Sequence, residues 1–582
     1  MKINPWMSEY TRWLDSPSLS EDEWKELDAI RGDEEEIRSR FRGPLEFGTA
    51  GLRGIMGAGI GRMNVHVIRW ATQAFAQLIV REGDEARRRG VCIDFDCRNH
   101  SEEFAHEAAC VCAANGVHVR LFDALRPTPE LSFAVLHYGV TAGINVTASH
   151  NPKEYNGYKV YWSDGAQLPP QHAADVAQTM SRIDLFSDVK SMDFETACEK
   201  GLIERIGEET DRAFMTRVMA QTIDRAAVSA AADKLSIVYT PFHGCGYKLV
   251  PEALRRMGLK NIYPVPEQMV IDGNFPTVES PNPENPEGFY LAAALAKEKN
   301  ASLIIGTDPD CDRVGVMARG ADGEYHTITG NQMGALLMDY IIGARRRTGR
   351  MPEKPAMIST IVSTGLARRI CEVNHIHYDE TFTGFKFMAE KLAEYRRDGS
   401  YEYLMAFEES YGYMMGDYVR DKDGVTASMM IAEMAAYYDG RGMTLLDAVQ
   451  ELYEKYGFYT ERTVNLFMEG VDGPERMAAL MNRLRGSTPA WIAGLRVVRM
   501  RDYRSGTVVV PGLGTVGNTE VSGSNVLYFE LEDGTAFIVR PSGTEPKIKI
   551  YVLARGDDAA ACTATAEACR AYAESLGKEN PI

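Results

Sequence analysis

The sequence predicts an α/β protein of about four domains whose last domain has a different, α+β architecture. The chain has 582 residues, and at roughly 150 residues per domain this length corresponds to about four domains. Apolar, strand-like runs alternate with segments of helical periodicity over most of the chain before residue 455, a pattern typical of parallel α/β layers. The residues after 455 follow a different pattern.

Individual segments support this division. Residues 330–347 predict a helix, because their apolar side chains recur on one face and three arginines end the segment, where the helix dipole favours cations. Leu303–Ile305 predicts a buried strand. Val526–Leu531 and Ala536–Val539 flank an Asp-Gly turn and predict a hairpin, and an Ala-rich helix follows near Asp557–Leu576. We therefore expect domains at residues 1–205, 206–320, 321–455 and 456–582.

Charge and composition exclude several classes of function. The 82 acidic residues outnumber the 64 Lys and Arg and give a formal net charge of −18, whereas nucleic acid and anionic membranes require basic surfaces. No apolar run approaches the roughly 20 residues of a membrane span, and the N-terminal segment lacks the apolar core of a secretory signal. The ten cysteines are scattered without a C-x-x-C pair. We therefore expect reduced thiols and a cytoplasmic protein with no nucleic-acid or membrane partner.

The most informative segment is Gly143–Pro152, with the sequence GINVTASHNP. A short apolar strand leads into a small polar loop that Asn-Pro turns. Ser149 lies at the exit of the strand, where side chains of α/β sheets face the ligand crevice. A serine hydrolase is disfavoured, because His150 is adjacent to Ser149 and the G-x-S-x-G motif is absent. Taken alone, the segment also fits an ordinary turn serine.

A second segment, Gly306–Arg313, places three carboxylates on alternate residues of a loop that follows an apolar strand. Asp308, Asp310 and Asp312 would repel one another without a neutralising cation, and carboxylate oxygens suit a hard divalent metal. The EF-hand pattern fails, because arginine stands where its sixth position needs glycine. An aspartyl nucleophile of the haloacid dehalogenase type would need Thr or Val in place of Asp312. A solvated acidic turn remains the alternative.

Three further segments carry weaker signals. Arg540–Lys547 combines an arginine, two hydroxyls, a glycine and a lysine between two strands, which suits a phosphate cradle or a plain turn rich in Pro and Gly. Phe407–Gly412 has adjacent carboxylates and a hydroxyl, which suit polyol recognition or a helix start. In Phe47–Gly54, glycines would let Arg53 approach an anion.

Together and in this order, these segments resemble the α-D-phosphohexomutase superfamily, specifically its phosphoglucomutase and phosphopentomutase branch. The resemblance spans nearly the whole chain, and Thr147–Pro152 and Asp308–Arg313 are its most specific motifs. It implies three related α/β domains with mixed sheets and a C-terminal α+β domain around a central cleft. It also implies an intramolecular phosphotransferase of the isomerase class. Such an enzyme would interconvert glucose 1-phosphate and glucose 6-phosphate through a phosphoserine and a glucose 1,6-bisphosphate intermediate that also serves as primer.

The resemblance implies a role for each matching residue. Ser149 would carry the phosphoryl group, with Lys159, Arg53 and His150 beside it in proton transfer and charge stabilisation. Mg²⁺ would be held by the phosphoserine and three carboxylates, Asp308, Asp310 and Asp312. Substrate would be bound by Arg313, Thr383, Gly384, Lys386, Glu408, Ser410, Arg540, Ser542, Gly543 and Thr544.

The sequence also departs from the family pattern. Phe407 and Tyr411 replace glycines that many members have around the sugar loop, so the preferred sugar stays open. A phosphopentomutase acting on ribose or deoxyribose 1-phosphate, a phosphomannomutase and a bisphosphate synthase are the near alternatives. A metal-dependent phosphatase built on Asp308 and Asp310, or a non-catalytic phosphosugar-binding protein, is more distant. The expected partner is a small phosphosugar, and the expected assembly is a monomer or weak dimer.

Overall fold

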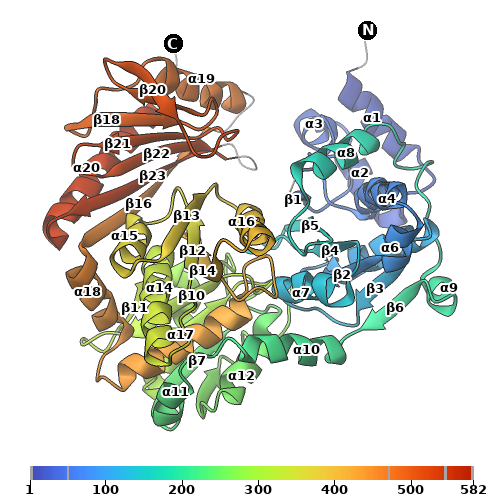
Figure 1. The fold of residues 1–582 in the computed structure, drawn as a ribbon. Coiled ribbons are helices and arrows are strands. Elements are labelled where there is room, and N and C mark those ends of the chain that lie inside the picture. The colour runs from blue at the N-terminus through green and yellow to red at the C-terminus, as the bar shows by residue number, and fades with distance from the viewer. Residues whose placement is uncertain (1–3, 49–50, 469–471, 543–546, 579–582) are drawn as a thin grey trace. The chain divides into compact units, whose positions relative to one another are not determined.

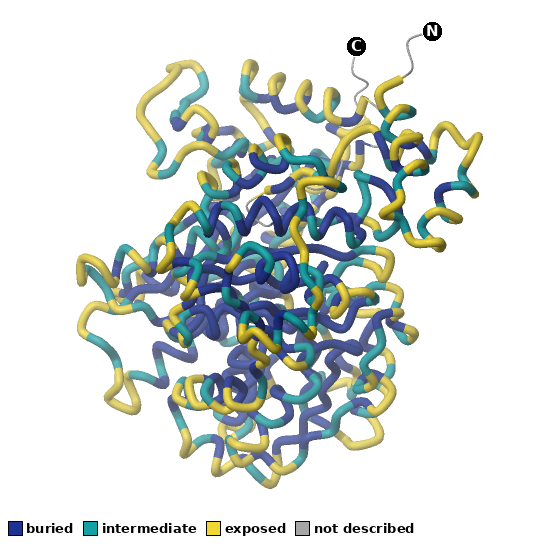
Figure 2. Tube along the Cα trace, turned by 90° about the vertical axis from the view of Figure 1, so that its right-hand side faces the viewer, coloured by how far each residue is buried: buried dark blue, intermediate teal, exposed yellow. Residues whose placement is uncertain are grey.

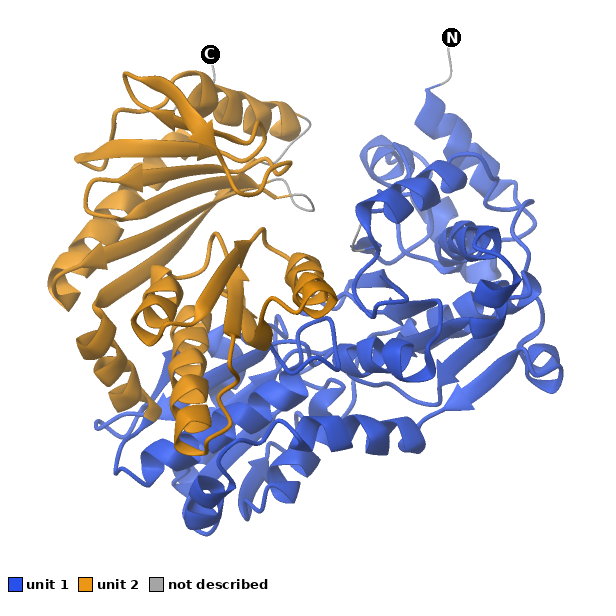
Figure 3. Ribbon diagram, viewed as in Figure 1, with its two compact units in different colours: residues 1–328, 411–444 blue, residues 329–410, 445–582 orange. Residues whose placement is uncertain are grey.

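The computed structural model describes residues 4–48, 51–468, 472–542 and 547–578. The chain forms two compact units, one comprising residues 1–328 and 411–444 and the other residues 329–410 and 445–582 (Figure 3). Helices cover mixed sheets in the first unit, and the C-terminal part of the second unit is an antiparallel sheet with helices (Figure 1). The predicted fold class is therefore confirmed, while the domain boundaries stay a prediction.

The first sheet has the strand order β1-β5-β4-β2-β3-β6 and carries the serine loop. β2 pairs in parallel with β3 and β4, whereas β5 runs antiparallel to β4 and β1. β2 and β4 are buried along their whole length, as expected for strands covered on both faces. The strands are β1 (Leu52–Ile55), β2 (Val91–Phe95), β3 (Val119–Phe122), β4 (Ala142–Val146), β5 (Tyr155–Trp162) and β6 (Ile203–Ile206).

Nine helices of the described chain surround this sheet or precede it. α6 and α7 pack against β2 and β4, and α4 packs against α6 and α8. The helices are α1 (Pro5–Leu14), α2 (Glu21–Ala29), α3 (Glu34–Phe41), α4 (Val65–Arg81), α5 (Asp84–Arg89), α6 (Ser101–Ala114), α7 (Thr128–Tyr138), α8 (Pro170–Met180) and α9 (Phe194–Glu199).

The second sheet carries the loop with the three aspartates, in the order β11-β10-β9-β7-β8. β7 pairs in parallel with β8 and β9, and β10 is antiparallel to β9 and β11. Its strands are β7 (Ser236–Thr240), β8 (Asn261–Pro264), β9 (Leu303–Thr307), β10 (Val314–Arg319) and β11 (Tyr325–Ile328). The helices of this part are α10 (Glu208–Met219), α11 (Arg225–Ala231), α12 (Gly246–Arg256), the 3-10 helix η1 (Pro286–Phe289) and α13 (Tyr290–Lys299).

Residues 411–444 belong to the first unit although they come late in the chain. They contain β15 (Gly412–Met415) and α17 (Gly424–Asp439), and α17 packs against α11 and α12. This return of the chain brings charged residues just before α17 to the aspartate loop.

The second unit begins with the predicted helix, α14 (Gly330–Arg347), which has the predicted bounds. Thr329 and Gln332 form a capping box at its start, and three arginines occupy its last turn, where they suit the helix dipole. β12 pairs in parallel with β13 and β14. The other elements here are β12 (Pro355–Thr360), α15 (Gly365–Asn374), β13 (His377–Thr381), α16 (Phe385–Asp398), β14 (Glu402–Glu408) and α18 (Leu445–Tyr456).

The C-terminal sheet is antiparallel, in the order β16-β23-β22-β21-β18-β19-β20, and β17 pairs with β18. α20 packs against β16 and β23 over an apolar core, and the predicted hairpin and terminal helix are confirmed as β21–β22 and α20. The elements are β16 (Phe458–Phe467), α19 (Gly473–Gly486), β17 (Trp491–Ile492), β18 (Leu495–Asp502), β19 (Thr507–Val510), β20 (Gly514–Asn518), β21 (Leu527–Leu531), β22 (Ala536–Pro541), β23 (Lys547–Gly556) and α20 (Ala559–Lys578).

Buried residues concentrate in the sheets and in the helix faces that cover them (Figure 2). Among the described residues, no helix combines the length and the apolar character that a membrane crossing would require.

Candidate functional site

The serine loop leaves β4 in a constrained conformation. Ser149 has a φ of 54°, in the left-handed region that non-glycine residues adopt only rarely. Its backbone N–H donates to Thr147 Oγ1 over 2.8 Å, and Thr147 is itself fully buried. The Thr147 hydroxyl thus holds a turn that presents the serine hydroxyl at the end of the strand.

Arg98 clamps the backbone of this loop. Its guanidinium donates to the carbonyl oxygens of Ser149 over 2.6 Å, Pro152 over 2.8 Å and Tyr155 over 3.0 Å, and also to that of Asn151. Arg98 is only 3% exposed and pairs with Asp96. Arg98 could not be identified from the sequence, because nothing in its neighbourhood links it to a loop about 50 residues later.

The Ser149 hydroxyl lies against the aspartate loop. Ser149 Oγ donates to Asp308 Oδ2 over 2.7 Å and lies 3.2 Å from His150 Nδ1. Burial, with Arg313 and Arg53 nearby, holds the pKa of His150 well below its ordinary value, so the imidazole is neutral. The structure thus brings together the serine and the first aspartate, which lie 159 residues apart in the sequence.

The three aspartates follow β9 and converge. Asp308, Asp310 and Asp312 are at most 1% exposed, and each offers an oxygen within 4.8 Å of the others. Asp308 Oδ1 accepts hydrogen bonds from the backbone N–H groups of Asp312 and Arg313, each over 3.0 Å. Asp310 Oδ1 and Asp312 Oδ1 have no hydrogen-bond partner among the described residues. This cluster could hold a metal ion.

Two lysines offset part of the negative charge. Lys159 Nζ lies 2.6 Å from Asp310 Oδ2 and 3.3 Å from Asp312 Oδ2, and Lys422 Nζ lies 3.1 Å from Asp312 Oδ2. Burial and the two neighbouring carboxylates raise the pKa of Asp308 well above its usual range. Burial acts in the same direction on Asp310, but Lys159 overcomes it and holds the pKa of Asp310 below the ordinary value.

Lys422 contacts the aspartate cluster but could not be identified from the sequence. Asp421 accepts hydrogen bonds from its backbone N–H and its Nζ, and Asp421 itself is fixed by Tyr161. The local sequence, Asp-Lys-Asp before a helix, is typical of a capped helix start and carries no signal of a distant metal loop.

Close backbone approaches fix the aspartate loop. A Cβ added to Gly244 would lie 2.4 Å from Pro309 Cα, and the next residue, Cys245, donates its N–H to Pro309 O over 2.8 Å. Gly424 N donates to the carbonyl oxygen of Cys311 over 3.1 Å. The loop is therefore held by one segment that precedes it in the sequence and another that follows it.

Two of the predicted arginines, Arg53 and Arg313, also lie in the first unit. Arg53 Nη1 donates to Asn151 Oδ1 over 3.3 Å, and Arg313 Nη1 forms an ion pair with Glu284 Oε1 at 2.9 Å. The first unit thus gathers Arg53, Ser149, His150, Lys159, Asp308, Asp310, Asp312 and Arg313.

The remaining predicted residues lie in the second unit. Glu408 ends β14, so the segment is a strand end and not a helix start. Its Oε1 accepts a hydrogen bond from Gly384 N, and its Oε2 accepts one from Ser410 Oγ over 3.4 Å. Thr383 precedes Gly384 and Lys386 follows it by two residues, and Lys386 Nζ lies 4.6 Å from the centre of the Phe387 ring.

Charged residues of the C-terminal sheet lie near the same strand end. Arg540 of β22 stands opposite Lys549 of β23. Burial and the charge of Glu408 raise the pKa of Glu409 to about 7, while Lys549 and Arg540 act in the opposite direction. Ser542 N donates to Lys547 O over 2.9 Å. Gly543 and Thr544 lie outside the described residues.

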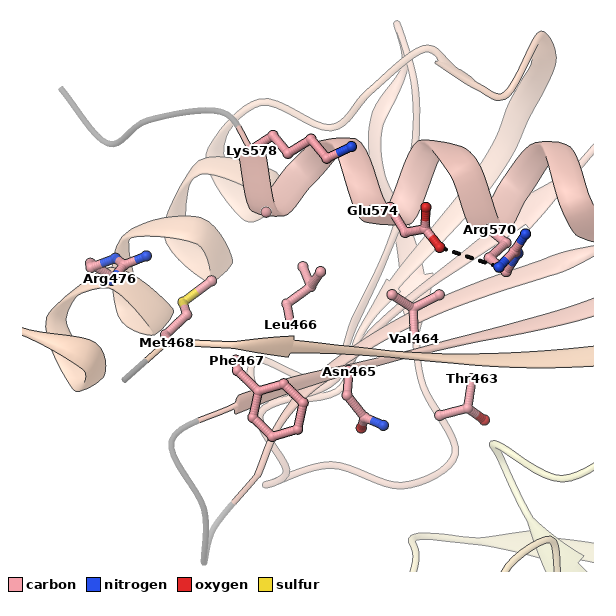
Figure 4. Close-up of a pocket in the computed structure, with 11 residues that line it drawn as sticks. Thr463, Val464, Asn465, Leu466, Phe467, Met468, Arg476, Arg570, Glu574 and Lys578 are labelled. Carbon is pink, nitrogen blue, oxygen red and sulfur yellow. Dashed lines mark ion pairs between the residues drawn. The ribbon is translucent and has the colours of Figure 1, made fainter. Parts of the chain in front are cut away.

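A groove of about 620 Å³ between β16, α19 and α20 contains none of the predicted residues (Figure 4). Apolar Leu466, Phe467 and Met468 line it together with charged Arg476 and Arg570. The groove has no cluster of groups suited to catalysis, so the site rests on the residues described above.

Comparison with known proteins identifies the family. The four domain models of the phosphoglucomutase/phosphomannomutase family match residues 44–186, 213–321, 329–456 and 495–570. The chain belongs to this family. Its members are mutases, so the chain is an enzyme of the isomerase class.

Individual relatives agree with this assignment. The chain is 35% identical over 513 residues to a phosphoglucomutase of Staphylococcus haemolyticus, covering 88% of this chain and 90% of the relative. It is 36% identical over 520 residues to a phosphoglucomutase of Staphylococcus aureus, with 89% and 91% covered.

Solved structures share the fold. A phosphoglucomutase/phosphomannomutase family protein from Burkholderia thailandensis has a TM-score of 0.65 at 19% identity, covering 92% of this chain and 98% of that one. The phosphoglucomutase parafusin from Paramecium, in its open form, has a TM-score of 0.66 at 16% identity, with 92% and 97% covered.

Proposed function

We propose that the enzyme is a phosphoglucomutase that interconverts glucose 1-phosphate and glucose 6-phosphate through phospho-Ser149 and a glucose 1,6-bisphosphate intermediate. The observation that carries the proposal is the 2.7 Å hydrogen bond from Ser149 Oγ to Asp308, within a loop of three buried carboxylates. This hydrogen bond brings the proposed nucleophile into contact with the proposed metal-binding cluster. The relatives named phosphoglucomutase support glucose as the sugar.

The carboxylate cluster fits Mg²⁺. Asp310 Oδ1 and Asp312 Oδ1 are buried without a hydrogen-bond partner in the described chain, and hard carboxylate oxygens are the ligands that Mg²⁺ prefers. Asp308, Asp310 and Asp312 would hold the ion, with phospho-Ser149 as a further ligand. When bound, Mg²⁺ stabilises negative charge on the transferred phosphoryl group.

The reaction proceeds by two phosphoryl transfers. In the first, the bond from Ser149 Oγ to phosphorus breaks, a bond forms from phosphorus to the free sugar hydroxyl, and that hydroxyl loses its proton. Ser149 Oγ then takes up a proton and is held by Asp308, with His150 Nδ1 3.2 Å away. In the second transfer, Ser149 Oγ loses its proton and attacks the other phosphate of the bisphosphate. The bond from that phosphorus to the sugar oxygen breaks, the freed sugar oxygen takes up a proton, and Ser149 regains a phosphoryl group.

Positive side chains make the approach of two anions feasible. A phosphoserine carries a charge of about −1.5 to −2 at neutral pH, so an unscreened phosphosugar would be repelled. Lys159 and Lys422 already contact the carboxylates, and Arg53 and Arg313 add charge in the same unit. Phosphoryl transfer depends on such positioning and electrostatic stabilisation more than on covalent chemistry by the protein.

Most of the proposed substrate contacts lie in the second unit, whereas Arg313 lies in the first. Glu408 and Ser410 would bind sugar hydroxyls, and the orientation of the Glu408 carboxylate by Gly384 N and Ser410 Oγ supports this role. Thr383 and Lys386 flank this point. Arg540 and Ser542, with Gly543 and Thr544, would bind the phosphate that is not reacting.

Replacement of Ser149 by alanine tests the proposal. We expect Ser149→Ala to abolish conversion of glucose 1-phosphate in a coupled assay primed with glucose 1,6-bisphosphate. Ser181→Ala, at the end of α8 on the surface, serves as the matched control and should retain full activity. Full turnover by Ser149→Ala would contradict the mechanism, whereas release of inorganic phosphate that does not require Ser149 would favour a phosphatase.

The choice of sugar is tested separately. The kcat/KM values for glucose 1-phosphate, mannose 1-phosphate and ribose 1-phosphate should rank glucose first. A much higher value for the pentose would make the enzyme a phosphopentomutase.

All ten cysteines are unpaired, which supports a cytoplasmic location, and a monomer or weak dimer remains the proposed assembly.

A further inference from the structure

Thr128, the first residue of α7, holds Asp310 at two points. Thr128 N donates to the backbone carbonyl oxygen of Asp310 over 2.9 Å, and Thr128 Oγ1 donates to Asp310 Oδ2 over 2.9 Å. Both residues are 0% exposed, so water cannot replace either hydrogen bond. The contacts fix the backbone and the carboxylate of Asp310 together.

The hydroxyl of Thr128 is itself oriented by Asn145 of β4. Asn145 Nδ2 donates to Thr128 Oγ1 over 2.8 Å, and Asn145 is also 0% exposed. A threonine hydroxyl has one proton, and its lone pairs accept. Because Asn145 donates to this oxygen, the single hydroxyl proton is directed to Asp310. The result is a chain from amide to hydroxyl to carboxylate.

These hydrogen bonds determine which oxygen of Asp310 stays without a hydrogen-bond partner. Asp310 Oδ2 accepts hydrogen bonds from Thr128 and from Lys159 Nζ, over 2.9 Å and 2.6 Å. Asp310 Oδ1 has no partner among the described residues. Two donors on one oxygen lock the rotation of the carboxylate and leave the other oxygen available to a cation.

The Thr128 side chain has no competing role in its own helix. α7 starts after Pro127, and no side chain caps its first turn. Threonine at a helix start commonly caps the helix by accepting from a backbone N–H, whereas here the hydroxyl hydrogen-bonds, among the described residues, only Asn145 and Asp310. A valine would fill the same volume and suit the same helix start.

We propose that Thr128 and Asn145 are positioning residues that orient Asp310 for binding the divalent metal. The inference rests on the proposed function in so far as the aspartate cluster holds a metal. Partners that orient a metal ligand through hydrogen bonds typically contribute about 10–100-fold to metal affinity or activity. Both residues act through Asp310 and neither needs to contact the substrate.

The test compares Thr128→Val with Thr128→Ser. Valine keeps the shape and the backbone N–H but removes the hydroxyl, and serine keeps the hydroxyl. Binding of Mg²⁺ to dephosphorylated enzyme is measured by titration calorimetry, and binding of Mn²⁺ by electron paramagnetic resonance. We expect Thr128→Val to bind both ions about 10–100-fold more weakly and Thr128→Ser to stay near wild type. Raising Mg²⁺ should restore much of the lost turnover in Thr128→Val.

Unchanged metal affinity in a folded Thr128→Val variant would overturn the inference. If that variant does not fold, Asn145→Leu is measured instead, since it removes the donor to Thr128 while keeping a similar shape. We expect a smaller loss of affinity, of about threefold or more, within the range of one hydrogen bond, and no loss would again overturn the inference. Absence of metal binding or phosphoryl transfer in the wild-type enzyme would instead refute the proposed function.

Discussion

Replacing Arg98 with lysine removes the planar guanidinium that holds the serine loop, while the positive charge is kept. Arg98 donates to four backbone carbonyl oxygens of the loop and lies almost fully buried. The lysine ammonium carries its three protons on one atom, so it cannot span carbonyl groups that a planar guanidinium reaches from two nitrogens. We expect Arg98→Lys to leave at least two of these carbonyl groups unpaired.

The magnitude follows from those lost hydrogen bonds. A hydrogen bond from a charged donor contributes about 1.5–3 kcal/mol, so losing two costs about 3–6 kcal/mol. Ser149 in its left-handed conformation adds strain that the clamp offsets. If about 3 kcal/mol of this loss falls on the active loop conformation, kcat/KM drops roughly 100-fold, since each 1.36 kcal/mol is a factor of ten.

The assay measures steady-state turnover and phosphorylation of Ser149 separately. Steady-state kcat/KM is compared with the rate at which Ser149 is phosphorylated by glucose 1,6-bisphosphate in a single turnover, and both should fall. Arg89→Lys is the matched control, because Arg89 also bridges two carbonyl groups, those of Gly139 and Val140, at a surface turn. A folded Arg98→Lys enzyme with activity within twofold of wild type would refute the reasoning.

Three further predictions concern Lys422, Gly244 and Glu409. Lys422→Met should lower kcat/KM by about tenfold or more, since Asp312 loses one of its two lysine partners; steady-state kinetics at saturating Mg²⁺ measures this, and unchanged kinetics would exclude a role for Lys422. Gly244→Ala should destabilise the protein by about 1–3 kcal/mol in urea unfolding and weaken Mg²⁺ binding, because its Cβ would meet the backbone of Pro309. The pKa of Glu409 is raised to about 7, against an unfolded value of about 4.3. Its protonation therefore stabilises the fold fully below the unfolded pKa, and this contribution is lost as pH rises through about 7. The free energy of unfolding in urea should therefore fall less between about pH 5 and pH 8 in Glu409→Gln than in wild type, by on the order of 1–3 kcal/mol. Identical pH profiles of the two proteins would refute this.

Local patterns in the sequence predicted the elements whose determinants are local. α14 was predictable because a helical apolar face and terminal arginines lie within one segment. The serine and aspartate loops were predictable because each concentrates its functional groups within a few residues. The segment around Glu408 was ambiguous, since adjacent carboxylates suit both a helix start and a strand end, and only its pairing with β12 decides between them.

Contacts between distant segments could not be predicted in this way. Thr128 and Asp310 are 182 residues apart, and Lys422 reaches the aspartates only because the chain returns to the first unit after residue 410. The expectation that a metal would neutralise the three carboxylates was incomplete for the same reason. Lys159 of β5 and Lys422 of the loop before α17 also offset part of their negative charge.

The central claim is that Ser149 carries and exchanges the phosphoryl group. Intact-mass measurement with peptide mapping of the purified enzyme tests it most directly, before and after addition of excess glucose monophosphate. We predict a sub-stoichiometric gain of one phosphate located at Ser149, which is lost to the sugar and regained from glucose 1,6-bisphosphate. An enzyme that turns over glucose 1-phosphate while Ser149 never acquires phosphate under any of these conditions would contradict the account.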